Sequence, residues 1–296
     1  MFHSTQPSFV ALLLPLSSGN KGDMLIAIIT VFFIEAQNQQ SDAMLALEKR
    51  YGRCINLADL APDKAINSAL EWQAGGGGVP ARHCEAMALA RLGEFGESAA
   101  RLERIAEDLE FTKGLPRSKG KSPAAGPIVA ADVWHQAANV WLLGSELDRA
   151  ADAIDKALAL VPRESNRASQ YLIDRARISA AEGDYASAYE DLRSVEKKDP
   201  ARRDILLYIA SAARQLGYLD EADFALGVYI PTYPEDPAGF LELGYLREEQ
   251  GRKSAARQSW LKVLDLDGDS PAADSARAAL QRHALVSERQ PSDPDG

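Results

Sequence analysis

Few residues of this chain have the types and the spacing that catalysis or metal binding requires. Three of the four histidines, His83, His135 and His283, lie far apart in the sequence, and neither H-E-x-x-H nor C-x-x-C occurs. The glycine run at 75–78 is not followed by Lys-Ser or Lys-Thr, so it lacks the pattern of a phosphate-binding loop. The sequence therefore predicts no metal site, no cofactor and no enzyme.

One acidic segment, residues 265–269 with the sequence DLDGD, is similar to the start of a calcium-binding loop. Such a loop needs glycine at the place that Ser270 occupies and a bidentate glutamate at the place of Ala276. Because both are missing, we interpret the segment as a turn that closes a repeat.

The strongest pattern in the chain is that repeat. Gly183, Gly217 and Gly251 lie 34 residues apart. An alanine follows each glycine five positions later: Ala188, Ala222 and Ala256. This period is typical of one helix-turn-helix pair, in which the glycine permits the turn and the alanine lets the two helices approach closely.

These marks resemble the tetratricopeptide repeat (TPR) family, which has tryptophan, glycine, alanine and proline at set places. Four consecutive repeats fit the family pattern, and they begin at Ala131, Ser169, Arg203 and Pro237. The resemblance implies an all-α fold, a right-handed α-solenoid of helix-turn-helix repeats. It places four TPR repeats at 131–268 and degenerate TPR-like repeats at 41–111.

The first of the four repeats has two tryptophans, Trp134 and Trp141, at places where the family has core residues. They are seven residues apart, two turns along one face of a helix, so we expect both to anchor the core. The turn of this repeat departs from the family pattern, because Ser145 occupies the usual place of glycine and Gly144 comes one residue early.

The chain beyond the last repeat has a helix signal and then a polar end. Ser270 can cap a helix and Pro271 suits its first turn, which predicts a capping helix at 270–285. Residues 286–296 have too few apolar side chains to offset the entropy of ordering, so we expect a disordered tail.

Two insertions interrupt the repeats. The larger one is a basic loop rich in proline and glycine at 112–130, and its cations are Lys113, Arg117, Lys119 and Lys121. It is either a docking site for an acidic partner or a solvated insertion that the fold tolerates, and the second interpretation is favoured. The smaller insertion adds four residues after Pro162.

The overall charge limits the possible partners. The chain has a formal net charge of -10 at pH 7 and a sequence pI near 5.0. Binding to nucleic acid or to an anionic lipid surface depends on a basic footprint, so the sequence argues against both. A protein or peptide is the expected partner.

The N-terminus predicts export. Residues 24–34 form an apolar run that is too short to span a bilayer but suits a signal peptide, which we place at 1–36 with cleavage after Ala36. Translation starting at Met24 is an alternative. The chain is then periplasmic or secreted, and it contacts a membrane only through an uncleaved N-terminal segment; the alternative is a cytoplasmic protein.

Two cysteines, Cys54 and Cys84, bear on the same question. In the frame of the TPR family they lie on the first helices of adjoining repeats, which are neighbours in space. An oxidising compartment would let them form a disulfide. They are otherwise two small buried apolar residues that never meet, and this alternative has nearly equal weight.

The resemblance also implies a concave groove that binds peptides, lined by side chains from the first helix of each repeat. Carried over to this chain, the groove residues are His135, Asn139, Asp174, Arg177, Tyr208, Ser211, Arg214 and Tyr245. The tyrosines offer contact area, and the arginines offer forked donors for carboxylates unless Arg177 pairs with Asp174 on its own helix. Acidic Asp174 and Asp204 stand in the places of the clamp that holds chaperone tails, which argues against that ligand.

Three hypotheses for the function follow. The first is a non-enzymatic adaptor in a bacterial envelope that binds a partner protein or peptide in the groove. The second is a cytoplasmic or membrane-tethered assembly protein with the same fold. The third is an enzyme whose site lies around His135, Asp174 and Arg177.

Overall fold

A computed structural model describes residues 42, 44–111 and 126–289 of the chain. The chain divides into two compact units, Met1–Arg53 and Cys54–Gly296. In the first unit, residues 44–53 are helical. The predicted signal peptide, most of the basic loop and the end of the predicted tail lie outside the described residues.

The second unit contains the helices that position the predicted site. They are α2 (Pro62–Ala74), α3 (Gly78–Arg91), α4 (Phe95–Glu110), α5 (Gly126–Leu143), α6 (Leu147–Ala159), α7 (Asn166–Glu182), α8 (Tyr185–Lys198), the 3-10 turn η1 (Arg203–Ile205), α9 (Leu206–Gln215), α10 (Leu219–Thr232), α11 (Pro237–Glu249), α12 (Lys253–Leu266) and α13 (Pro271–Arg289). Among the residues that the structure describes there is no strand. The all-α prediction is confirmed.

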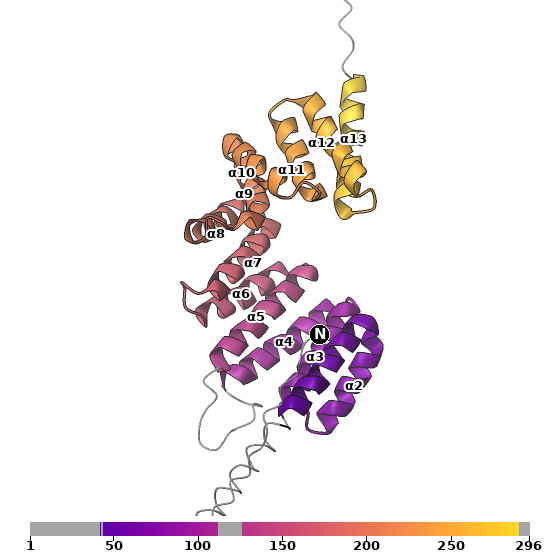
Figure 1. Ribbon diagram of the computed structural model, residues 1–296, viewed down its shortest axis with the longest axis vertical. Coiled ribbons are helices and arrows are strands. Elements are labelled where there is room, and N and C mark those ends of the chain that lie inside the picture. The colour runs from indigo at the N-terminus through magenta and orange to yellow at the C-terminus, as the bar shows by residue number, and fades with distance from the viewer. Residues whose placement is uncertain (1–41, 43, 112–125, 290–296) are drawn as a thin grey trace, which may run out of the picture. The chain divides into compact units, whose positions relative to one another are not determined.

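Successive helices of this unit pack against one another in chain order (Figure 1). Short turns join the two helices of each pair: α3 with α4, α5 with α6, α7 with α8, α9 with α10, and α11 with α12. Such pairs stack so that each contacts mainly its neighbours, which is the construction of a helical-repeat solenoid.

The turns inside the pairs use a left-handed backbone conformation. Gly183 ends α7 with a φ of 84°, and a Cβ atom added there would meet nothing within 4 Å. Glycine is therefore needed for the backbone angle and not for space. Ser145 makes the same turn between α5 and α6 with a φ of 61°, and it is the one non-glycine residue in the described ranges with a positive φ.

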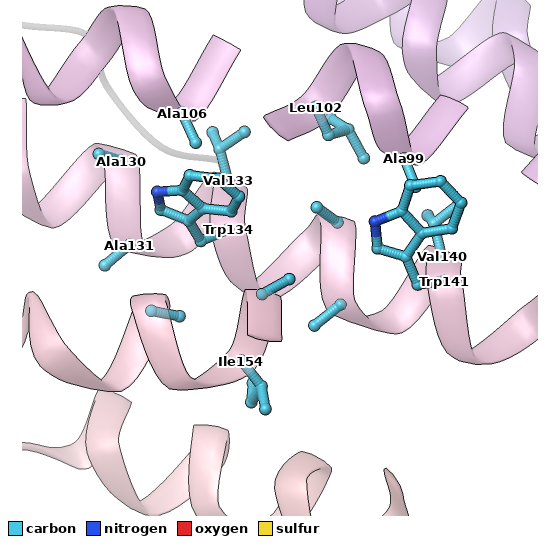
Figure 2. Packing of buried hydrophobic residues seen from close by; sticks show 14 of the residues in the cluster. Ala99, Leu102, Ala106, Ala130, Ala131, Val133, Trp134, Val140, Trp141 and Ile154 are labelled. Carbon is cyan, nitrogen blue, oxygen red and sulfur yellow. The ribbon is translucent and has the colours of Figure 1, made fainter. Parts of the chain in front are cut away.

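The two tryptophans of α5 anchor the core, as predicted. Both indole rings are buried, and Figure 2 shows them among alanines and branched side chains of α4, α5 and α6. The indole N–H of Trp134 donates to Glu110 at 2.5 Å, and that of Trp141 donates to Glu103 at 2.8 Å. Each large apolar ring is thus fixed to α4 by a polar bond at its edge.

The buried core passes from one pair to the next through shared helices. Tyr171 and Ile178 of α7 belong to the cluster that contains both tryptophans of α5. Ile173 and Ala176, also on α7, belong to the following cluster, which reaches Leu246 of α11. A single helix therefore contributes to two parts of the core.

Two predicted boundaries differ from the structure. The loop predicted at 112–130 ends earlier, because α5 already begins at Gly126 and Pro127 suits its first turn. At the other end, α13 continues to Arg289, so residues 286–289 are helical and not part of a disordered tail. Glu288 and Arg289 both have good helix propensity, which lets the helix continue past the predicted end.

The last helix, α13, has a capped N-terminus and packs with its small residues on α12. The Ser270 hydroxyl accepts a hydrogen bond from the backbone N–H of Ala273 at 3.2 Å, which satisfies one free donor of the first turn. A row of small residues of α13 packs on Trp260 of α12. The row consists of Ala273, Ala276 and Ala279.

Candidate functional site

The eight predicted groove residues lie on the first helices of four successive pairs. They are His135 and Asn139 on α5, Asp174 and Arg177 on α7, Tyr208, Ser211 and Arg214 on α9, and Tyr245 on α11. Residues of each set are three or four positions apart, so they occupy one face of their helix. We call these eight residues the first-helix surface.

A polar cluster joins α5 to α7 around a buried carboxylate, and we call it the Asp174 cluster. Asp174 Oδ2 lies 2.6 Å from His135 Nε2 and 3.2 Å from Gln170 Nε2, and Oδ1 accepts from Arg177 Nη1 at 2.8 Å. Burial raises the pKa of Asp174, but the hydrogen bonds from His135, Arg177 and Gln170 outweigh it and lower the pKa to about 2. The carboxylate is therefore ionised at neutral pH.

The partners of His135 determine which role its Nε2 atom takes. Its Nε2 atom lies 2.6 Å from the Asp174 carboxylate and 2.9 Å from the Asn139 side-chain nitrogen. An ionised carboxylate can only accept, so Nε2 carries a proton and donates it to Asp174. The Asn139 amide donates instead to the His135 backbone carbonyl at 3.2 Å, and the imidazole ring stacks on Tyr171 with centroids 4.6 Å apart. His135 is thereby held in one position.

A second cluster, the Arg214 cluster, joins α9 to α11. Arg214 Nε donates to Glu242 Oε1 at 2.6 Å, and its Nη1 atom donates to Glu249. Arg214 and Glu242 are both buried, and the guanidinium lies 5.5 Å from the ring centroid of Tyr245. A buried arginine between two carboxylates is a charge satisfied within the protein.

These contacts correct the expectation that the arginines are free donors for a ligand. Arg177 pairs with Asp174 on its own helix, which is the alternative that the sequence allowed. Arg214 pairs with carboxylates of α11, because the next first helix brings Glu242 and Glu249 against it. Any part that these two residues take in binding stays a prediction.

The tyrosines differ in how much of each is accessible. Tyr208 on α9 has 41% of its surface exposed. Tyr245 on α11 is half-buried and packs edge-on against Trp260, with ring centroids 5.9 Å apart. Ser211, one turn after Tyr208, is also half-buried. Tyr208 is therefore the aromatic contact that the first-helix surface offers most openly.

Four residues outside the predicted set extend the polar links between neighbouring pairs. Gln136 of α5 lies 2.5 Å from His83 of α3, measured from Oε1 to Nε2. Burial lowers the pKa of that histidine. Gln170 accepts from Arg202 Nη2 at 2.9 Å, just before η1. The spacing of four residues between Gln170 and Asp174 was a sequence signal for the bond between those two side chains. No local spacing indicated the link from Gln136 to His83 or the link from Gln170 to Arg202.

The two cysteines form a disulfide. Cys54 lies in the helical residues 54–60 and Cys84 in α3, and their Cα atoms are 6.0 Å apart. Of the two alternatives that the sequence left open, the structure contains the bridge. It ties the helical segment before α2 to the first helix of the pair α3 and α4.

The acidic segment 265–269 lies in the turn between α12 and α13. Asp267 is the C-terminal cap of α12, and its Oδ1 atom accepts from the backbone N–H of Asp269 at 3.2 Å. Within residues 42, 44–111 and 126–289, no group of three or more His, Cys, Asp or Glu side chains is placed to hold a metal ion. In the same ranges, no helix combines the length and the apolar content needed to cross a bilayer.

Neither a family model nor a curated protein matches the chain. Solved structures do resemble it. PilF of Pseudomonas aeruginosa is 12% identical, with a TM-score of 0.54, and the match covers 79% of this chain and 99% of PilF. A MamA fragment from Desulfovibrio magneticus RS-1 is 16% identical, with a TM-score of 0.50, and the match covers 65% of this chain and 97% of the fragment.

A third structure, YrrB, is described as a TPR protein with an unusual peptide-binding site. It is 17% identical, with a TM-score of 0.47, and the match covers 74% of this chain and 98% of YrrB. At these identities the likeness to PilF and MamA establishes the fold alone, an all-α helical-repeat solenoid.

Proposed function

We propose that this chain, a tetratricopeptide-repeat protein by its fold, is a non-enzymatic adaptor that binds a segment of a partner protein on the first-helix surface. The partner segment is extended or helical and runs across α5, α7, α9 and α11. Tyr208 and Tyr245 supply aromatic contact, and the ion-pair clusters supply fixed polar groups around them.

The observation that carries this proposal is the series of side-chain links between successive pairs. His83 contacts Gln136, His135 contacts Asp174, and Arg214 contacts Glu242. The links hold α3 to α5, α5 to α7, and α9 to α11, so the surface residues are positioned before a ligand arrives. A surface that is already ordered loses less entropy when it binds, which favours recognition of a protein segment.

The contacts of His135 favour binding over catalysis. The bond from Nε2 of His135 to Asp174 leaves Nδ1 able to accept a proton, so this bond alone does not decide between the two roles. Nucleophilic catalysis would in addition need a hydroxyl or thiol beside the ring. In the described part of the chain, no serine, threonine or cysteine side chain is hydrogen-bonded to this histidine. The arrangement of His135, Asp174 and Arg177 therefore supports a structural role for these three residues.

We further propose that the adaptor works outside the cytoplasm, in the periplasm or as a secreted protein. The disulfide between Cys54 and Cys84 supports this, because such bonds persist in oxidising compartments and are rare in the cytosol. The apolar run at 24–34 supports it independently. Thiol labelling of the unreduced protein from its native host tests the compartment: two alkylated cysteines would contradict export.

Site-specific photo-cross-linking tests the binding surface. A photoreactive phenylalanine analogue in place of Tyr208 should cross-link a discrete partner in native cells. The matched control is the same analogue in place of Phe224, which is 72% exposed on α10, a second helix. Both positions are exposed aromatics, so they differ in the surface they report and not in chemistry.

The expected result is a product at position 208 that is absent at position 224. The recovered partner should then bind the purified wild-type protein and bind the Tyr208→Ala variant more weakly. A partner that cross-links equally at both positions, or at position 224 alone, would place the binding surface away from the first helices.

A further inference from the structure

A second candidate site lies between α6, α7 and α8. It is a pocket of about 990 Å³, lined by the end of α6, the connection that follows it, the first turns of α7 and the last turns of α8. None of the eight residues of the first-helix surface lines it. A volume of this size is at the upper end of the range for pockets that hold small ligands.

The pocket occurs where the repeat pattern is stretched. The connection from α6 to α7 comprises residues 160–165, whereas those from α10 to α11 and from α12 to α13 comprise the shorter stretches 233–236 and 267–270. Val161 lines the pocket from this longer connection and is buried. The insertion after Pro162 thus coincides with an opening between the second helices of two adjoining pairs.

The floor of the pocket is apolar. Val195 of α8 is almost fully buried, and Leu158 of α6 and Leu172 of α7 are half-buried at the pocket surface. Because the two leucines are partly accessible, an apolar side chain of a ligand would remove their surface from water. That burial is favourable in proportion to the area covered.

Two carboxylates of the wall are already bound. Arg175 donates from Nε and Nη2 to Asp191 at 2.7 and 2.8 Å, and from Nη1 to Asp155 at 3.0 Å. Together with Asp155, the forked pair between Arg175 and Asp191 links α6, α7 and α8 across one wall. Three of the five N–H donors of Arg175 are therefore used within the protein, and two carboxylates offset its charge, so a ligand has to be recognised mainly by other groups.

Those groups are the three other cations of the lining. Lys198 Nζ donates to the Ser165 backbone carbonyl at 2.8 Å and to the Ser169 hydroxyl at 2.9 Å, and both acceptors are neutral. Lys197 and Arg163 are exposed at the pocket, and in the described ranges no carboxylate lies within ion-pair distance of either.

The charge of the pocket therefore differs from that of the chain. The four cations of its lining outnumber the three carboxylates, on a protein with a net charge of -10. The cations are Arg163, Arg175, Lys197 and Lys198, and the carboxylates are Asp155, Glu164 and Asp191. A ligand that complements the cations carries negative charge, and one that complements the floor carries an apolar group beside it.

We propose that this pocket binds an acidic segment of a partner polypeptide, in which a carboxylate side chain lies next to a large apolar one. The carboxylate contacts Lys198, Lys197 and Arg163, and the apolar side chain packs on Leu158 and Leu172. This site is separate from the first-helix surface, so a partner can use either surface without the other.

Fluorescence anisotropy with a defined probe tests the proposal on the full chain. The probe is a fluorescein-labelled peptide of alternating aspartate and leucine, and its control has asparagine in place of each aspartate. The test variant is the double change Arg163→Glu and Lys197→Glu. The matched control is Lys253→Glu with Arg257→Glu, two exposed cations of α12 whose reversal changes the net charge equally.

We expect the acidic probe to bind the wild type, and the test variant to bind it at least tenfold more weakly. The control variant and Tyr208→Ala should change the affinity less than twofold, and the asparagine probe should not bind. Equal losses in the two double variants would overturn the proposal, since they would indicate attraction by net charge alone. Displacement of the probe by inorganic phosphate at millimolar concentration would overturn it too, because a general anion site would then explain the binding.

Discussion

The Asp174 cluster and the Arg214 cluster both include residues of the first-helix surface, but the buried charge at the centre of each has the opposite sign. Asp174 is a buried acid with three donors around it, and one of them, Arg177, is 41% exposed. Arg214 is a buried base between two acids, and its main partner Glu242 is buried with it. Loss of one partner should therefore matter little in the first cluster and much in the second.

The largest effect is expected for Arg214→Ala. The change leaves Glu242 buried without its cation, and breaking a buried pair in this way costs about 3 to 5 kcal/mol. Denaturant unfolding measures the loss. The double change Arg214→Met with Glu242→Leu is the control, because it removes both charges and should recover much of the stability. Equal losses in the single and double variants would contradict the burial argument.

The second-largest effect is expected at low pH, where protonation of Asp174 should reduce the stability of the folded state. The pKa of Asp174 falls from 3.8 to about 2 on folding. A lowered pKa stabilises the folded state above the unfolded value, and this contribution disappears as the pH falls from near 4 through 2. It amounts to about 2 kcal/mol. The measurement is the free energy of unfolding at about pH 6 and about pH 2 for the wild type and Asp174→Asn, and the variant should lose less between the two values.

The smallest effect on stability is expected for Arg177→Ala. Arg177 is partly exposed, and Asp174 keeps its bonds to His135 and Gln170 when the guanidinium is removed. Exposed pairs contribute less than about 1 kcal/mol, so the variant should unfold close to the wild type. A loss as large as that of Arg214→Ala would remove the distinction between the two clusters.

The sequence predicted the parts of this structure that depend on local pattern. The period of the glycines located the turns, and the spacing of Trp134 and Trp141 identified the core face of α5. The sequence also indicated an ion pair between Asp174 and Arg177 as one alternative, because the two residues are three positions apart on one helix. Local spacing and the constraints of a helix determine all three features.

The rest depends on how separate helices approach each other. Arg214 and Glu242 are 28 residues apart, and their contact forms only when α9 and α11 pack side by side. The pocket between α6 and α8 likewise follows from the distance between two helices, of which the extra residues after Pro162 were only an indirect sign. The sequence indicated the surface but not which of its charges are already paired.

The most direct test of binding on the first-helix surface is the affinity of the cross-linked partner for two matched variants. Tyr208→Ala removes an exposed ring from the first-helix surface, and Phe224→Ala removes one from a second helix. Calorimetry should show that Tyr208→Ala weakens binding by about 1 kcal/mol or more, roughly fivefold, while thermal unfolding stays nearly unchanged and Phe224→Ala binds like the wild type. Unchanged affinity in Tyr208→Ala together with a loss in Phe224→Ala would contradict binding on the first-helix surface.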